Sequence, residues 1–189
     1  FELDIKEKAY PFDILIHGDH LYPNGDFIAN LDQRTLVRVS ACGEVIWRSD
    51  HGSHHSVDVD EDGFVWTPIL TQYYQEPTLR FGGFRFDQIG KFDPNTGELL
   101  TVIDLVKILK EADAAGIVLM NAPNPGDMMH LNDVEILTKE MADAFQEFQA
   151  GDLLLSSRHF NQLWVIDGKT HRLKWWQTGP MMGQHDPDF

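Results

Sequence analysis

The chain contains an internal repeat, and this repeat limits the possible folds more than any other feature of its 189 residues. In the first two copies, a histidine precedes a short apolar run and lies eight residues before the glycine of a turn, Gly25 or Gly63. The copies start at His17, His55, His130 and His185, which are 38, 75 and 55 residues apart. Shared landmarks at unequal spacing indicate one supersecondary unit with insertions.

Each copy has the signals of short antiparallel strands. Apolar or alternating runs are separated by turn dipeptides such as Asn24-Gly25 and Asp62-Gly63. Groups of about four strands, repeated with glycine and aromatic landmarks, are typical of β-propeller blades. The sequence therefore predicts an all-β fold in which residues 1–189 form one partial β-propeller domain of about three blades and the start of a fourth. Since propellers usually close with four to eight blades, we expect this domain to be part of a longer chain.

Two insertions explain most of the unequal spacing: 71–87 with 104–116, in and after the second copy, and 138–149 in the third. Apolar spacing in 104–119 and in 138–149 is helical, so we expect short helices there. The segment 71–87 is either a loop over the channel mouth that stacks on an aromatic ligand or an edge hairpin packed against a neighbouring blade or subunit, and we favour the hairpin. It interleaves two arginines with five aromatic residues: Arg80, Arg85, Tyr73, Tyr74, Phe81, Phe84 and Phe86. The five tryptophans are expected in the core or at blade junctions: Trp47, Trp66, Trp164, Trp175 and Trp176.

Composition excludes several classes of function. The formal net charge of −15 disfavours electrostatic capture of nucleic acid or of an anionic membrane surface. We expect no membrane insertion, because no stretch approaches the ~20 apolar residues of a membrane span. The only cysteine, Cys42, allows neither an internal disulfide nor a Cys-rich zinc site. A phosphate-binding loop of the Walker type is also absent from the sequence.

The histidines at the repeat starts are the strongest candidates for a functional site. In a propeller, the first strand of every blade lines the central channel, so equivalent positions of successive blades converge on the axis. His17, His55, His130 and His185 share this phase, with Asn132 near the third. The alternative is structural, with each histidine satisfying backbone groups at a blade junction. Four histidines in phase favour a polar axial site.

Four segments resemble the arylsulfotransferase family. They are HHSVDVDEDG (54–63), MHLNDVEIL (129–137), GDLLLSSRHFNQLWVIDGKTHRLKWW (151–176) and GQHDPDF (183–189). The resemblance covers residues 54–189, and residues 1–53 agree only as a further blade. It implies a propeller of six blades when complete, in a periplasmic or secreted enzyme that moves a sulfuryl group between phenols without a nucleotide sulfate donor.

The resemblance also implies roles for individual residues. His185 would be the nucleophile that becomes sulfated, and the sulfuryl group would be surrounded by His55, His130, Asn132 and Arg158. Because His54 is adjacent to His55, the sequence leaves open which of the two faces the site. The chain departs from the family pattern at His171, which replaces a turn glycine.

The side chains suit this chemistry by their own properties. Neutral imidazole is a strong uncharged nucleophile, and its unperturbed pKa is near 6.5. Arg158 and the amide of Asn132 can meet the charge on the sulfuryl oxygens. A second histidine, His130 or His55, can protonate the departing phenolate and later deprotonate the acceptor. This ping-pong cycle needs no cofactor and no metal, and its partners are small aromatic sulfate esters and phenols.

Two other functions fit the same pattern. One is a non-catalytic propeller that binds ligands or assembles with partners, including further copies in a homo-oligomer, because a fold does not determine a function. The other is a metalloenzyme whose ion is held by the axial histidines and by HGSHH (51–55). Aryl sulfate turnover that survives chelation would distinguish the sulfotransferase from both.

Overall fold

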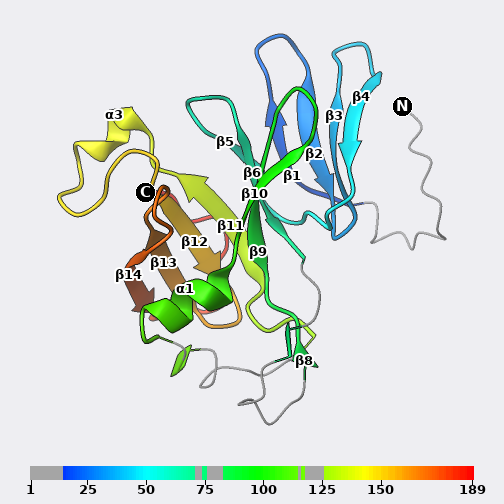
Figure 1. Cartoon of the computed structure of the whole chain (residues 1–189). Coiled ribbons are helices and arrows are strands. Elements are labelled where there is room, and N and C mark those ends of the chain that lie inside the picture. Colours follow the sequence, from blue (N-terminus) through cyan, green and yellow to red (C-terminus); the bar gives the residue numbers. More distant parts are fainter. Residues whose placement is uncertain (1–14, 71–73, 76–82, 115, 118–125) are drawn as a thin grey trace.

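Three four-stranded antiparallel sheets form most of the protein (Figure 1). The computed structural model describes residues 15–70, 74–75, 83–114, 116–117 and 126–189. The first sheet contains β1 (Ile16–Leu21), β2 (Phe27–Leu31), β3 (Thr35–Val39) and β4 (Val45–Ser49). The second contains β5 (Asp58–Val59), β6 (Val65–Ile69), β9 (Gln88–Phe92) and β10 (Leu99–Ile103). The third contains β11 (Leu131–Ile136), β12 (Leu153–Ser157), β13 (Gln162–Ile166) and β14 (Leu173–Thr178).

Every sheet is a simple meander. Its strands pair antiparallel in the orders β1-β2-β3-β4, β5-β6-β9-β10 and β11-β12-β13-β14. The sheets do not close into a barrel within the described residues, and each has the four-stranded form of a propeller blade. The predicted all-β class and the blade-like sheets are therefore confirmed.

A small hairpin is inserted between β6 and β9. Its strands β7 (Tyr74–Gln75) and β8 (Gly83–Phe84) pair antiparallel. Phe84 and Phe86 are both 1% exposed, and the Phe86 ring centroid lies 6.2 Å from that of Phe160, in the turn between β12 and β13 of the third sheet. For these two residues, the hairpin packs against the neighbouring blade, as favoured above. The side chains of Tyr73, Tyr74, Arg80 and Phe81 lie outside the described part of the structure.

The first predicted helix is shorter than expected. Helix α1 (Leu105–Glu111) begins at Asp104, whose side chain accepts the Lys107 N–H at 3.0 Å. It ends well before residue 119, because Asp113 has a φ of 54° and left-handed residues end helices. Residues 116–117 are again helical. The short helix expected within 104–119 is therefore present, and it covers only part of that segment.

The second predicted helix, over 138–149, is a single turn. Helix α3 (Lys139–Ala142) is capped by the Thr138 hydroxyl, which accepts the Met141 N–H. Beyond it, the Phe145 and Phe148 ring centroids lie 5.6 and 6.0 Å from that of Phe189. Packing of these aromatic rings against the C-terminal segment replaces the helical continuation that their spacing predicted.

Two apolar clusters join neighbouring sheets. One spans the second and third sheets and contains Trp66 and Trp164, and the other spans the first and second and contains Trp47. The Trp47 indole N–H donates to Pro94 O at 2.7 Å, which links β4 to the β9–β10 turn. Trp176 contradicts the core prediction because it is 49% exposed on β14, the outer strand of its sheet.

The first strands of the three sheets lie close to one another. Ser56 Oγ accepts the Val134 N–H at 2.9 Å, and Asp58 Oδ2 accepts the Ile136 N–H at 2.9 Å. Side chains of the second blade thus satisfy the free edge of β11, which a sheet edge requires when it is buried. This contact brings the repeat starts together.

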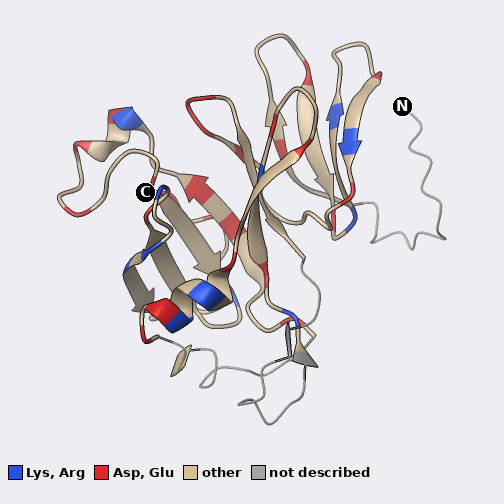
Figure 2. Ribbon diagram, viewed as in Figure 1, with Lys and Arg blue, Asp and Glu red and all other residues tan. Residues whose placement is uncertain are grey.

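Acidic residues are unevenly distributed. Residues 151–189 contain four acidic and four basic residues, so the net charge of −15 comes from the preceding 150 residues. Figure 2 shows acidic positions along β11 and in the turn after β5, whereas basic positions lie on β3, β4, α1 and α3. Among the described residues, no helix combines the length and hydrophobicity needed to cross a membrane.

Candidate active site

Four histidine rings from the repeat starts meet where the first strands approach one another. The His55 ring centroid lies 4.8 Å from His17, 4.8 Å from His130 and 6.0 Å from His185. The His130 and His185 centroids are 6.5 Å apart. The structure therefore contains the cluster that the phase of the repeat predicts, and the roles of its members stay predictions.

Two of these histidines have the same unusual backbone. His55 and His130 have φ values of 56° and 52°, and Asp186, which follows His185, has 51°. Non-glycine residues in this left-handed region cost on the order of 1–3 kcal/mol each, and they are concentrated at functional sites. Because His55 and His130 occupy equivalent positions, the left-handed turn is a property of the repeat that aims both side chains at the cluster.

His130 is held by a carboxylate. Its Nδ1 lies 2.5 Å from Asp127 Oδ2. Burial alone would raise the pKa of Asp127, but the hydrogen bond from His130 and the nearby His130 and His159 hold it below its ordinary value. His159 Nδ1 donates to the Asp127 backbone oxygen at 2.8 Å, and its ring centroid lies 4.6 Å from His130. His130 thus has one oriented nitrogen and leaves Nε2 for chemistry.

The segment that carries His185 is fixed by its neighbour Gln184. The Gln184 side-chain amide donates to Ser157 O and to Gln162 O, both at 3.0 Å. Asn132 Nδ2 donates to the Gln184 backbone oxygen at 2.6 Å. One N–H of Asn132 therefore positions the His185 segment.

Arg158 follows β12 and lies beside the cluster. Its backbone N–H donates to His130 O at 3.1 Å, and its Nη1 lies 3.4 Å from His159 Nε2. Burial first, and then the charge of Arg158, lower the pKa of His185. The positive charge of the guanidinium is therefore near enough to His185 to disfavour a second charge there.

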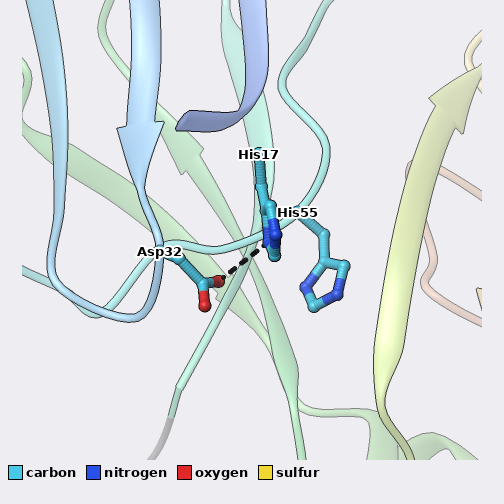
Figure 3. A group of neighbouring side chains, drawn as sticks. All are labelled: His17, Asp32 and His55. Atoms are coloured by element: carbon cyan, nitrogen blue, oxygen red, sulfur yellow. Dashed lines mark ion pairs between the residues drawn. The ribbon is translucent and has the colours of Figure 1, made fainter. Parts of the chain in front are cut away.

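His17 extends the cluster beyond the residues predicted as catalytic. Its Nδ1 lies 3.2 Å from Asp32 Oδ1, and Figure 3 shows His55 beside this pair. His17 and His130 therefore each have a carboxylate partner, and both rings contact His55. His17 shared the phase of the repeat, but no sequence signal identified Asp32.

The structure separates the roles of the two adjacent histidines. His55 makes the ring contacts with His17, His130 and His185, whereas His54 is 3% exposed and lies behind it. Their Nδ1 atoms are 2.9 Å apart. The question that the sequence left open is thus answered geometrically: His55 faces the cluster.

The environment favours uncharged imidazoles. Burial lowers the pKa of His54 to about 3 and that of His55 to about 2, with the neighbouring histidines adding to the effect. Several rings in one place cannot all carry charge, because like charges disfavour protonation. His54, His55 and His185 are therefore neutral at pH 7.

Two groups of side chains offer donor atoms within 4.8 Å of one another and could be considered for a metal: His17, Asp32 and His55, and Asp127, His130 and His159. Tetrahedral zinc with bonds of about 2.0–2.2 Å places its ligand atoms roughly 3.3 Å apart. Within each group, a histidine Nδ1 already pairs with the carboxylate. Each group therefore has the residue types of a metal site, and the histidine–carboxylate contact in it is also explained without an ion.

The sequence analysis did not identify several residues of the site. Two of them are near the motifs in sequence: Asp127 lies three residues before His130, and His159 directly follows Arg158. Asp32 and Asp87 lie in connections between strands, far from the motifs that they support. Their participation depends on the tertiary arrangement.

A comparison with known proteins identifies a family model that matches this chain. A family model described as arylsulfotransferase (ASST) matches residues 20–189. No curated protein sequence matches significantly. The chain is also similar to the crystal structure of a protein of unknown function from Bacteroides caccae, with 13% sequence identity and a TM-score of 0.48. That match covers 90% of this chain and 48% of the other, so the chain spans about half the length of that protein.

Proposed function

The chain belongs to the arylsulfotransferase family, and from this premise we propose that the protein moves a sulfuryl group from an aryl sulfate to a phenolic acceptor through a sulfohistidine at His185. No nucleotide sulfate donor takes part. One observation carries the proposal: His55, His130 and His185 meet in one cluster, and the charge of Arg158 acts on His185.

The first step needs an uncharged nucleophile. The lowered pKa of His185 keeps its imidazole neutral at pH 7. A neutral nitrogen approaches the negatively charged sulfate ester without the repulsion that an anion would meet. It attacks sulfur, the bond from sulfur to the phenolic oxygen breaks, and the phenol leaves.

Charge on the transferring oxygens is met by fixed groups. Arg158 supplies a permanent positive charge and a planar set of donors. One N–H of Asn132 donates to Gln184 O. Its second N–H supplies a neutral donor for the sulfuryl oxygens. Such oriented groups stabilise charge more effectively than water does, since they are already in place when the reaction starts.

Proton transfer completes the cycle. His130 or His55 protonates the departing phenolate, and the same residue then removes the proton of the acceptor phenol. Sulfohistidine 185 passes its sulfuryl group to that phenol, which regenerates the neutral imidazole. Donor and acceptor therefore use one site in turn.

We also propose that residues 1–189 are one partial propeller domain of a longer, six-bladed protein. Family membership supports small aromatic sulfate esters and phenols as its partners and a periplasmic or secreted location.

Trapping of the intermediate tests this function. Incubation with a chromogenic aryl sulfate, followed by rapid quenching and peptide mass spectrometry, is expected to give a sulfated peptide that contains His185. His185→Asn should abolish both this peptide and phenol release. His171→Asn is a matched control, because His171 has a φ of 57° that asparagine tolerates and lies outside the cluster.

Each other outcome has a defined meaning. Phenol release without sulfation of His185 would exclude the covalent mechanism. Activity lost on chelation and restored by zinc would favour the metalloenzyme, and binding of aryl sulfates without turnover would favour the non-catalytic propeller.

A further inference from the structure

A buried pair of side chains lies behind His55 and is not used by the reaction described above. His54 and Asp87 are 3% and 4% exposed. His54 contacts His55 through Nδ1 at 2.9 Å, and its Nε2 lies 3.6 Å from Asp87 Oδ1. The three groups therefore form a line from the cluster into the interior.

The same site has room for a bridging water. A cavity of about 50 Å³ is lined by His54, Asp87, Asp127 and His130, among others. This volume is sufficient for one water molecule with several polar partners. His54 Nε2 is fully buried and lies slightly beyond hydrogen-bond distance from Asp87 Oδ1, so a small side-chain shift is sufficient to bring the two into direct contact.

The charge of the carboxylate determines the direction of this line, because an ionised carboxylate can only accept hydrogen bonds. The Leu131 N–H donates to Asp87 Oδ2 at 2.6 Å. A direct contact of the other oxygen with His54 then requires that His54 Nε2 carries its proton. A neutral imidazole carries a single N–H, so His54 Nδ1 must then accept, and His55 Nδ1 must donate to it. His55 is left with an unprotonated Nε2 toward the cluster, which is the form that a general base needs.

We propose that Asp87, acting through His54, sets the tautomer of His55 and stores the proton that His55 exchanges with the phenols. Asp87 and His54 are thus positioning residues that complete a buried proton relay. This inference rests on the proposed function for its second half, whereas the tautomers can be observed without any turnover.

The proton balance of the relay closes. His55 Nε2 takes the acceptor phenol's proton as the phenol oxygen attacks the sulfur of sulfohistidine 185. The Nδ1 proton of His55 moves to His54 Nδ1, and the Nε2 proton of His54 moves to Asp87 Oδ1. Both imidazoles stay neutral, and Asp87 becomes a neutral acid. The reverse shift protonates the phenolate that leaves the donor.

Electrostatics make storage on Asp87 more favourable than storage on the rings. Burial raises the pKa of Asp87 to about 7, and Asp127 adds to this effect, whereas the Leu131 N–H and His130 oppose it. The pKa of His55 is about 2, so its imidazolium is strongly disfavoured. The titratable and charged groups that face the relay are His17, Arg85, Asp127, His130 and His185.

Asp87→Asn tests the tautomers directly. The amide oxygen must keep the Leu131 N–H, so the NH₂ group faces His54 Nε2 and requires a lone pair there. His54 then carries its proton on Nδ1, and His55 carries its proton on Nε2. Nitrogen NMR of ¹⁵N-histidine-labelled protein at pH 8 is expected to show both tautomers exchanged relative to the wild type.

Single-turnover rates test the proton transfer. In the wild type, sulfation of His185 needs the protonated relay and should slow as pH rises through about 7, where Asp87 ionises. Transfer to the acceptor needs the ionised relay and should accelerate over the same range. Asp87→Asn should remove the pH dependence of both half-reactions near pH 7. It should also slow each half-reaction by about 10²–10⁴-fold, the range for one acid–base group.

A second variant covers the case in which Asp87→Asn does not fold. His54→Asn keeps a partner for His55 Nδ1 but cannot reach Asp87, so the same losses are expected. Asp152→Asn is the matched control, because Asp152 is also buried but pairs with Lys174 outside the cluster.

Two results would overturn the relay. One is that the His54 and His55 tautomers in Asp87→Asn are those of the wild type. The other is that, in either variant, both half-reactions keep the rate and the pH dependence of the wild type. That result would leave His130 as the proton carrier. A wild-type protein that never sulfates His185 would instead contradict the proposed function, and the NMR result would still decide whether Asp87 sets the tautomers.

Discussion

Asp127 and His130 illustrate how one side chain prepares another at the scale of single residues. The short Nδ1 to Oδ2 contact holds the ring in one orientation. His130 differs in this respect from His55, whose nearest partners are other imidazoles. The cluster therefore contains one histidine that is oriented by a carboxylate and another whose low pKa keeps it neutral.

Replacement of Asp127 by Asn should impair catalysis more than folding. The amide can still occupy the same space, but its hydrogen bond to His130 Nδ1 lacks the charge of the carboxylate and orients the ring less firmly. We expect the steady-state rate with a chromogenic aryl sulfate to fall by about 10²–10³-fold, the range for loss of one oriented charge-stabilising group. Asp143→Asn, in the exposed turn after α3, removes an equal charge and should have no effect. An unchanged rate in Asp127→Asn would contradict this role.

The contact between β1 and the start of the second blade shows what matters at the scale of elements. Gly18 follows His17 on β1, and a Cβ built on it would lie 2.0 Å from His55 O and 2.8 Å from two backbone atoms of Ser56. Only glycine allows this approach. The left-handed turn at His55 and the missing side chain at Gly18 thus belong to one packing arrangement.

Gly18→Ala should therefore displace the His55 turn. Backbone atoms cannot move aside as a flexible side chain would, so we expect a loss of about 1–3 kcal/mol in the free energy of unfolding, as for an overpacked core. Thermal unfolding and the aryl sulfate assay are expected to decline together. Gly116→Ala is the control, because a Cβ there meets nothing within 4 Å. If Gly18→Ala is as stable and active as the control, the close approach does not position His55.

At the scale of the whole molecule, buried acids and buried histidines have opposite effects on stability. Burial raises the pKa of Asp133 to about 7 and that of Glu135 to about 6, and nearby carboxylates add to both shifts. In the unfolded chain, the ordinary aspartate pKa is near 3.9. Between these values the folded state holds a proton that the unfolded state has lost, so stability falls as pH rises from about 4 through 7. His54 and His55, with lowered pKa values, act in the opposite direction below about 6.5.

Asp133→Asn isolates the acidic contribution. The amide stays neutral at every pH, so the melting temperature of the variant, relative to wild type, should be higher at pH 8 than at pH 5. Differential scanning fluorimetry at both pH values measures this difference. For the control Asp143→Asn, the melting temperature relative to wild type should be the same at pH 5 and pH 8. If Asp133→Asn also gives the same relative melting temperature at both pH values, Asp133 does not have the raised pKa.

The sequence predicted the parts of the fold that depend on local patterns. Turn dipeptides and apolar alternation located the strands of the three sheets. They failed where distant contacts compete with local preference, as in 138–149, where Phe145 and Phe148 pack on Phe189 instead of extending α3.

By itself, the sequence determined the repeat, the β class, the family motifs and the equivalent repeat positions of His55, His130 and His185. Each of these depends only on residue types and their spacing along the chain. Only the tertiary structure decided that His55 and not His54 faces the cluster, and that Asp87 and Asp127 lie behind its histidines. Asp87 is 33 residues from His54 and 44 from Leu131, its backbone partner. Partners so far apart in sequence are selected by how the sheets pack, and no local pattern encodes that packing.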